Sequence, residues 1–302
     1  MADGLKTVQT QQAAAWRRHD RRWRDNRYAY AVVSRRSRGI SVGINLNPDK
    51  ACSFRCIYCQ VNRRDKPVIR KVDLQVLAAD LDRVLEAERD GSLYAEPPFD
   101  LLPPGERGVR DIAFSGDGEP TAFRHFEEAV RIAASARQRF GLEQTRIVLI
   151  TNAAHLRKPS VKSALRLLDE NNGEIWAKLD AGTEQYFRLV NHPKISLAAV
   201  FDNIVDAASL RPVVIQSLWF RLHGELPPDN EFGAYCNRLN ALLAAGGRIK
   251  KVQLYTIARD PAESCATPLS NEEVDSLAEF LRGQVPVTVE AFYGSADRIA
   301  GS

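Results

Sequence analysis

The 302-residue sequence contains no apolar run long enough to cross a membrane, which takes about 18 consecutive apolar residues. Residues 1–30 contain no apolar core followed by a cleavage site, so we expect no secretory signal. Cysteine is scarce as well: the chain has five, an odd number, which excludes a disulfide scaffold. We therefore expect a cytoplasmic protein whose thiols are reduced and free to bind metal.

Internal repeats and low-complexity tracts are also absent, and the composition of 44% hydrophobic and 26% charged residues excludes disorder over most of the chain. Acidic residues are scarce only near the start, where residues 1–71 carry 17 Lys and Arg against 5 Asp and Glu. The excess is concentrated in residues 16–24, where arginines alternate with two tryptophans. Such a stretch can bind a phosphate backbone. The other interpretation, which we favour, is a solvated amphipathic helix.

Strand and helix patterns alternate along the rest of the chain. The strand patterns cover residues 40–46, 111–115, 146–151, 174–180, 213–220, 249–257 and 285–292, and the helix patterns cover 73–89, 126–140, 159–169, 197–210, 230–245 and 271–282. Strict alternation implies parallel strands joined by right-handed crossovers. Six units are too few for a closed eightfold barrel, which leaves a partial barrel or a doubly wound sheet. Both folds bind ligands at the C-terminal ends of the strands.

Three of the five cysteines, Cys52, Cys56 and Cys59, stand within eight residues after the first predicted strand. Thiolates this close can bind one soft metal centre. Zinc usually takes four ligands in paired spacings, and the chain has no second pair. Three thiolates on a four-iron cluster would leave one iron open for chemistry. Chance clustering of three core cysteines is the alternative, but the polar neighbours of these residues argue against it.

The cysteine loop, with Tyr58 before its last cysteine, resembles the cluster signature of the radical S-adenosylmethionine superfamily, and the resemblance covers residues 40–261. It implies an α/β fold, a partial (β/α)6 TIM-like barrel with one extra terminal strand. A [4Fe–4S] cluster on Cys52, Cys56 and Cys59 and S-adenosylmethionine are the implied cofactors, and reductive cleavage to a 5′-deoxyadenosyl radical is the implied chemistry. Tyr58 would lie near the adenine or simply pack the loop. We expect a basic extension (1–33), a core domain (34–295) and a tail (296–302).

A second motif, residues 114–121, follows the second predicted strand and contains two glycines that allow close approach of a ligand. It resembles the Gly-Gly-Glu element of the superfamily, which holds the methionine amino group. Asp117 separates the two glycines and departs from that element. Gly118 and Glu119 are therefore the expected contacts.

Polar residues also stand at the ends of the next two predicted strands. By the resemblance, Asn152, Lys178 and Asp180 would touch the ribose and carboxylate of the cofactor. Alternation places Lys178 and Asp180 on one face, so a structural ion pair inside the barrel is the other interpretation. Gln216, Tyr255 and Thr256 are weaker candidates of the same kind.

The remaining cysteines and histidines give weaker signals. Cys236 is expected to be a small buried residue in a helix. Cys265 follows the sixth strand and is a weak candidate for a catalytic thiol or ligand on the rim. His125 and His223 are expected to be surface residues rather than ligands.

A narrower resemblance concerns the substrate. Residues 34–36, 41–46 and 256–263 are similar to the subgroup of the wyosine-forming tRNA enzymes, which rebuild a methylated guanine with pyruvate. Those enzymes bind a second cluster through upstream cysteines, and this chain has none before Cys52. Arg35 and Arg36 either bind an anionic substrate or pair with acidic surface residues, and the sequence leaves both open.

The expected function is hydrogen abstraction from an unidentified substrate, with an electron donor such as flavodoxin or ferredoxin and no membrane partner. The subgroup resemblance and the basic N-terminus favour RNA. The alternatives are a protein substrate, as for a glycyl-radical activating enzyme, and a non-catalytic iron–sulfur or zinc protein.

Overall fold

The computed structural model describes residues 23–294. Most of the basic stretch at residues 16–24 lies outside the described residues, and so does the expected tail at 296–302. Among the described residues, no helix has both the length and the hydrophobicity needed to span a bilayer.

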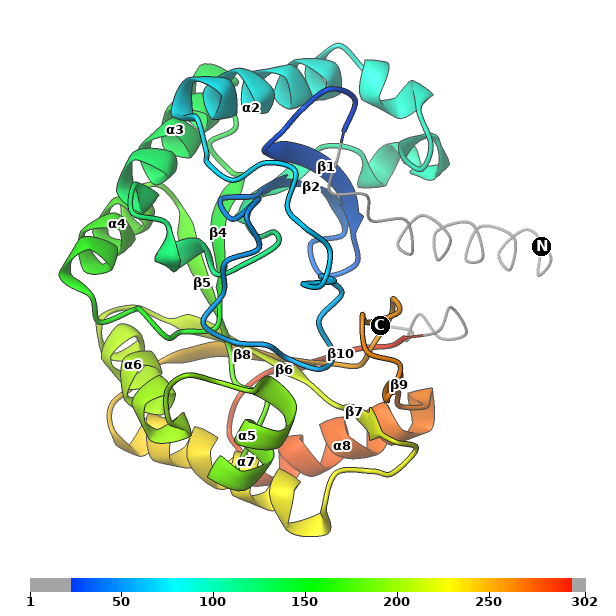
Figure 1. The fold of residues 1–302 in the computed structure, drawn as a ribbon, viewed down its shortest axis with the longest axis vertical. Helices are drawn as coiled ribbons and strands as arrows, with labels where there is room; N and C mark the ends of the chain where they lie inside the picture. Colours follow the sequence, from blue (N-terminus) through cyan, green and yellow to red (C-terminus); the bar gives the residue numbers. More distant parts are fainter. Residues whose placement is uncertain (1–22, 295–302) are drawn as a thin grey trace.

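A single curved sheet of eight strands occupies the centre of the molecule (Figure 1), in the order β1-β2-β3-β4-β5-β6-β8-β10. The strands are β1 (Ala29–Ser34), β2 (Gly39–Ile44), β3 (Val109–Phe114), β4 (Arg146–Thr151), β5 (Gly173–Lys178), β6 (Val213–Leu218), β8 (Ile249–Tyr255) and β10 (Val289–Phe292). All neighbours from β2 to β10 pair in parallel, whereas β1 pairs antiparallel with β2. This is the predicted partial barrel, with β10 as the extra terminal strand.

Helices cover the convex side of the sheet, between successive strands (Figure 1). They are α2 (Leu74–Arg89), α3 (Phe126–Arg139), α4 (Pro159–Asp169), α5 (Glu184–Asn191), α6 (Leu197–Leu210), α7 (Asp229–Ala244) and α8 (Asn271–Gln284). Four short 3-10 turns (Ser92–Ala95, Phe99–Leu101, Pro104–Glu106, Pro120–Ala122) and a separate two-stranded antiparallel sheet of β7 (Phe220–Leu222) and β9 (Ala266–Pro268) complete the described residues. Local chemistry fixes the helix ends: the Asp73 side chain caps α2, and Ser270 and Glu273 form a capping box on α8.

The inner face of the sheet is layered along the barrel axis. Near the N-terminal ends of the strands lies a charged layer, in which the Arg146 guanidinium lies 3.9 Å from Asp111 and 3.4 Å from Glu174. Above it is a small apolar cluster of Ala113, Val148, Trp176 and Val214. The C-terminal ends of the strands, where ligands bind in this fold, lie beyond this cluster.

The sequence analysis placed residues 29–33 in the N-terminal extension, began the core domain at residue 34, and missed β1. The strand is buried almost throughout, so its sequence is a continuous apolar run without the alternation that marks a half-exposed strand. Arg35, just after β1, donates a hydrogen bond to the carbonyl of Tyr293, just after β10. This contact links the two edge strands of the open barrel.

Candidate active site

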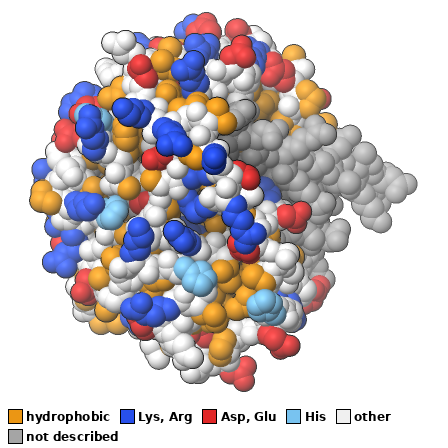
Figure 2. All heavy atoms as spheres, viewed as in Figure 1, with side chains coloured by type: hydrophobic (Ala, Val, Ile, Leu, Met, Phe, Trp, Pro, Cys, Tyr) orange, Lys and Arg blue, Asp and Glu red, His pale blue; other side chains and the backbone are white. Residues whose placement is uncertain are grey.

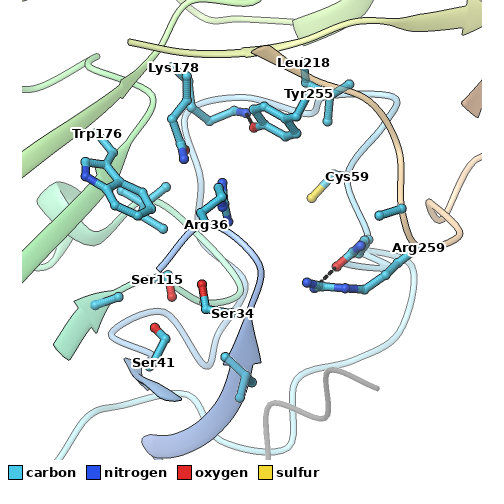
Figure 3. Close-up of a pocket in the computed structure, with 18 of the residues that line it drawn as sticks. Ser34, Arg36, Ser41, Cys59, Ser115, Trp176, Lys178, Leu218, Tyr255 and Arg259 are labelled. Atoms are coloured by element: carbon cyan, nitrogen blue, oxygen red, sulfur yellow. Dashed lines mark hydrogen bonds between the residues drawn. The ribbon is translucent and has the colours of Figure 1, made fainter. Parts of the chain in front are cut away.

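A cavity of about 300 Å³ lies inside the barrel, toward the C-terminal ends of the strands (Figure 3). The loops after β2 and β3 and the ends of β4, β5, β6 and β8 line it. All three clustered cysteines line this one cavity: Cys52, Cys56 and Cys59. Gly118 and Glu119 of the loop after β3, and Asn152 and Lys178 at the strand ends, line it too, so the three motifs of the sequence analysis meet in one place.

Each clustered thiol has a nitrogen donor beside it, from a distant part of the chain for Cys52 and Cys56 and from the same loop for Cys59. Asn152 Nδ2 lies 3.6 Å from Cys52 Sγ, Asn191 Nδ2 lies 3.3 Å from Cys56 Sγ, and Arg63 Nη2 lies 4.0 Å from Cys59 Sγ. Hydrogen bonds of this kind favour the thiolate over the thiol and tune an iron–sulfur cluster when the sulfurs ligate one. The donor set thus fits thiolate ligands rather than three chance core cysteines.

Burial opposes the thiolate in the absence of metal. It raises the pKa of the Cys56 thiol to about 12 and also raises the pKa of Cys52. A thiol in such surroundings keeps its proton until a metal replaces it. Among residues 23–294, no three His, Cys, Asp or Glu side chains are grouped closely enough to hold a single metal ion.

Helix α5 positions the cysteine loop. The backbone N–H groups of Arg55 and Ile57 donate to the carbonyls of Asn191 and Val190 at the end of α5, at 3.0 Å each. The Asn191 side chain also donates to the hydroxyl of Tyr58, at 2.9 Å. The sequence analysis identified neither α5 nor Asn191, because no local pattern connects a helix end with cysteines far back in the chain.

The loop after β3 packs directly on the cysteine loop. A Cβ atom added at Gly118 would lie 1.9 Å from the carbonyl oxygen of Ala51, closer than any side chain allows. The backbone N–H of Glu119 donates to the same oxygen at 3.2 Å. Gly118 is therefore required here for the contact between two loops, independently of any ligand.

The Glu119 carboxylate is buried and lies among protein donors. It accepts hydrogen bonds from the Thr121 side chain and backbone, from the Thr151 hydroxyl at 2.6 Å and from the Asn152 backbone at 2.7 Å. Burial raises its pKa, and these donors oppose that rise. In this structure Glu119 ties the loop after β3 to the end of β4, and so holds Asn152 against the cysteine loop.

Lys178 and Asp180 form the predicted pair on one face, with Lys178 Nζ 3.5 Å from the carboxylate. Lys178 also donates to the Tyr255 hydroxyl at 2.8 Å, and its ammonium lies over the ring of Tyr58. Burial lowers the pKa of Lys178, but Asp180 and Tyr255 more than offset it, so the pKa is raised and the amine stays charged. Asp180 accepts from the hydroxyl of Tyr58 and from the backbone of Leu218.

The family model of the radical SAM superfamily matches residues 46–225, more than half of the chain. The chain belongs to this superfamily. Its cofactors, as a member of this superfamily, are a [4Fe–4S] cluster and S-adenosylmethionine. The three-thiol donor set in the cavity fits that cluster.

Curated relatives are distant. The chain is 24% identical over 264 residues to a protein named GTPase Obg from Brachyspira hyodysenteriae, a match that covers 86% of this chain and 34% of that protein. It is 28% identical over 178 residues to a UPF0026 protein of Methanocaldococcus jannaschii, covering 59% of this chain and 47% of the relative. The chain thus spans a third to a half of the length of these two relatives.

A UPF0026 protein of Helicobacter pylori is 23% identical over 257 residues, with 83% of this chain and 72% of that protein covered. Among solved structures, TYW1 with a lysine-pyruvate adduct bound superimposes with a TM-score of 0.52 at 14% identity, covering 94% of this chain and 89% of that one. This likeness shows a shared fold.

The remaining residues that the sequence analysis considered for the site either lie away from the cavity or line its wall. Cys265 does not line the cavity, and its carbonyl accepts the backbone N–H of His223, which is exposed. Cys236 is buried in α7, as predicted, and His125 pairs with Glu128 at the surface. The weaker candidates Gln216, Tyr255 and Thr256 do line the cavity, as does Arg36, which the sequence analysis left undecided.

Proposed function

We propose that this radical SAM enzyme binds its cluster through Cys52, Cys56 and Cys59 and abstracts a hydrogen atom from an RNA substrate. The observation that supports the cluster assignment is the set of three thiols on one cavity, each beside a nitrogen donor. When bound, the cluster and S-adenosylmethionine supply a 5′-deoxyadenosyl radical.

The residues of the chain have distinct tasks in this proposal. Lys178, charged and directed into the cavity, offers an ammonium to the carboxylate of S-adenosylmethionine. Asn152 and Asp180 offer polar groups to the cofactor at the strand ends, beside the buried ring of Tyr58. Gly118 and Glu119 set the distance between the two loops. The barrel wall and the cysteine loop exclude water, which protects a reactive radical from side reactions.

The RNA part of the proposal is supported by charge. The loops at the C-terminal ends of the strands carry seven exposed cations that have no ion-pair partner among residues 23–294: Arg55, Lys66, Arg70, Lys71, Arg157, Lys158 and Lys194. Figure 2 shows lysine and arginine side chains gathered on the face that Figure 1 presents, where the cysteine loop crosses the barrel. A rim of this kind attracts a phosphate backbone.

The direct test is anaerobic. The protein, reconstituted with iron and sulfide, receives S-adenosylmethionine and a strong reductant, and 5′-deoxyadenosine is quantified beside the Cys56→Ala variant. We expect product from the wild type and none from the variant, because loss of one thiolate removes the cluster. Equal product from both proteins would contradict the assignment of Cys56 as a ligand. We further expect the electron donor in the cell to be a flavodoxin or ferredoxin in the cytoplasm.

A further inference from the structure

Two side chains close the cysteine loop, each bonding to the opposite end of it. Lys50, two residues before the first cysteine, donates from Nζ to the carbonyls of Asn62 at 2.7 Å and Asp65 at 3.0 Å. Arg63, after the last cysteine, donates from Nη1 back to the carbonyl of Lys50. The two ends of the loop are therefore held together by the protein itself, with the three cysteines between them.

Arg63 reaches beyond this closure toward the sulfur of Cys59. Its Nη1 also donates to the carbonyl of Asp117 in the loop after β3, at 3.2 Å, and its Nη2 lies 4.0 Å from Cys59 Sγ. Cys59 directs its sulfur into the cavity (Figure 3), and Arg63 lines the same cavity. The guanidinium thus lies where the cysteine loop, the loop after β3 and the cavity meet.

No carboxylate neutralises the charge of Arg63 within residues 23–294. Its side-chain hydrogen bonds there go to two backbone carbonyls and to sulfur. Its Nε is buried and has no partner in that part of the chain. A guanidinium that is partly removed from water in this way gains from an anion beside it, because the anion offsets the cost of desolvation.

The charged groups beside the other two thiols do not supply a free cation. Lys178, whose charge acts on Cys56, lies 3.5 Å from the carboxylate of Asp180. Burial raises the pKa of the Cys52 thiol, and the positive charge of Arg63 opposes that rise. Arg63 therefore already favours the anionic form of a thiol across the loop as well as lying beside Cys59.

A cation at this point matters because a cluster on three thiolates is an anion, and its reduction adds one more negative charge. A positive charge close to a ligating sulfur stabilises the reduced form more than the oxidised form, which raises the reduction potential. Glu119 acts on Cys52 in the opposite direction. Its carboxylate already accepts hydrogen bonds from the Thr151 hydroxyl and the Asn152 backbone, whereas Arg63 has no such counterpart.

We propose that Arg63 is the counter-charge of the iron–sulfur cluster, a positioning residue whose guanidinium offsets the negative charge at Cys59 and raises the reduction potential. The proposal rests on the cluster assignment made above and adds to it a residue outside the cysteine motif. The closure formed with Lys50 holds the guanidinium in place before a cluster is assembled, as outer-shell contacts do at other metal sites.

The test measures the cluster rather than turnover. The reconstituted protein is titrated with reductant, without S-adenosylmethionine or substrate, and electron paramagnetic resonance gives the ratio of reduced to oxidised cluster at each potential. At the wild-type midpoint we expect Arg63→Gln to lower this ratio at least tenfold, a shift of about 59 mV for a one-electron couple. Arg63→Lys keeps the charge and should retain most of the wild-type ratio.

Arg64→Gln is the matched control, because it removes the same charge from the next residue, whose side chain is 79% exposed. We expect this variant to keep the wild-type ratio. Raising the salt concentration to about 0.5 M should leave the effect of Arg63→Gln in place, since a partly buried charge is screened much less than an exposed one.

Equal ratios in Arg63→Gln and wild type would overturn the proposal, and so would an equal loss in Arg64→Gln or an effect that disappears at high salt. Equal losses in Arg63→Gln and Arg63→Lys, or a cluster missing from both, would also overturn it, since Arg63 would then act only by closing the loop. A cluster missing from Arg63→Gln alone would support it.

The same experiment separates this inference from the proposed function. A wild type that assembles no four-iron cluster would contradict the cluster assignment, and this proposal with it. A four-iron cluster whose reduction potential is independent of Arg63 would contradict the counter-charge alone.

Discussion

At the scale of single residues, the site depends on donors to sulfur. Asn191 bonds to Cys56 Sγ and to the Tyr58 hydroxyl at once, so it fixes both a ligand and the aromatic next to it. Hydrogen bonds to ligating sulfurs stabilise the more negatively charged, reduced state of an iron–sulfur cluster. Asn191 is therefore a positioning residue whose effect is measurable in the cluster itself.

We expect Asn191→Leu, nearly isosteric but without a donor, to lower the reduction potential of the reconstituted cluster. Loss of one hydrogen bond worth about 1 kcal/mol corresponds to about 40 mV for a one-electron couple. A redox titration followed by electron paramagnetic resonance measures the shift. Asn237→Leu, at an exposed position of α7, is the control and should retain the wild-type potential. A potential that is the same in Asn191→Leu as in wild type would show that this contact does not act on the cluster.

Single residues also show what the sequence can predict. The spacing of Cys52, Cys56 and Cys59 is a local pattern that is visible without a fold. Asn191 is 135 residues from Cys56, and only the docking of α5 brings the two together. Arg36 could not be assigned either, because its environment is made by strands far away in sequence.

At the scale of elements, two loops must approach closely for the cavity to form. Gly118→Ala places a Cβ atom against the Ala51 carbonyl and forces the loop after β3 away from the cysteine loop. We expect a loss of about 1–3 kcal/mol in the free energy of unfolding, the usual cost of overpacking, together with reduced iron retention. Urea denaturation and iron analysis of the reconstituted protein measure both.

The matched control is Gly233→Ala in α7, where an added Cβ meets nothing within 4 Å. Alanine favours a helix over glycine by about 1 kcal/mol, so this variant should be as stable as wild type or more stable. If both substitutions had the same effect, the close approach of the two loops would not be what requires Gly118.

The order of elements could be predicted from the sequence because the apolar residues of most strands and helices recur with different periods. The six strand–helix units and the final strand were all predicted. The first strand was not, because the run 29–34 is apolar on both faces and follows a basic segment. Helix α5 is short, with eight residues, and falls in a connection that already contained a longer helical pattern.

At the scale of the whole molecule, a layer of charged side chains lies near the N-terminal ends of the barrel strands. Glu174, in the layer below Trp176, bonds to Lys250 and to the Trp176 indole at 2.9 Å. Burial raises the pKa of Glu174, but Lys250, Trp176 and Arg146 outweigh it, so the pKa lies below its ordinary value of 4.5. Because the folded-state pKa is lowered, the carboxylate stabilises the fold above the ordinary pKa, and this contribution is lost as the pH falls below it.

We expect Glu174→Gln to lower the free energy of unfolding at pH 7 by about 1–2 kcal/mol, the worth of its charge-assisted bonds. Its stability should then fall less steeply than that of wild type as the pH drops from about 5 toward 3. Urea denaturation across this range measures both effects. Glu170→Gln, at an exposed position, is the control. If the free energy of unfolding fell equally steeply with pH in wild type and Glu174→Gln, the ionisation of Glu174 would not contribute to acid stability.

The two ends of the barrel also differ in what they offer to a large partner. If RNA docks on the rim of the cavity, replacing Lys66, Arg70 and Lys71 together by Gln should weaken the binding of a tRNA mixture. The log–log salt dependence should become shallower by about two units, since each phosphate contact contributes about 0.7.

The control neutralises three exposed arginines at the opposite end of the barrel, Arg166, Arg248 and Arg282, which changes the net charge equally. Because α4 and α8 run antiparallel to the strands, their last turns lie away from the rim. Filter binding from 50 to 200 mM salt should show a change only for the rim variant. Equal losses in both variants would mean that only net charge attracts RNA, and a flat salt dependence in the wild type would favour a protein substrate instead.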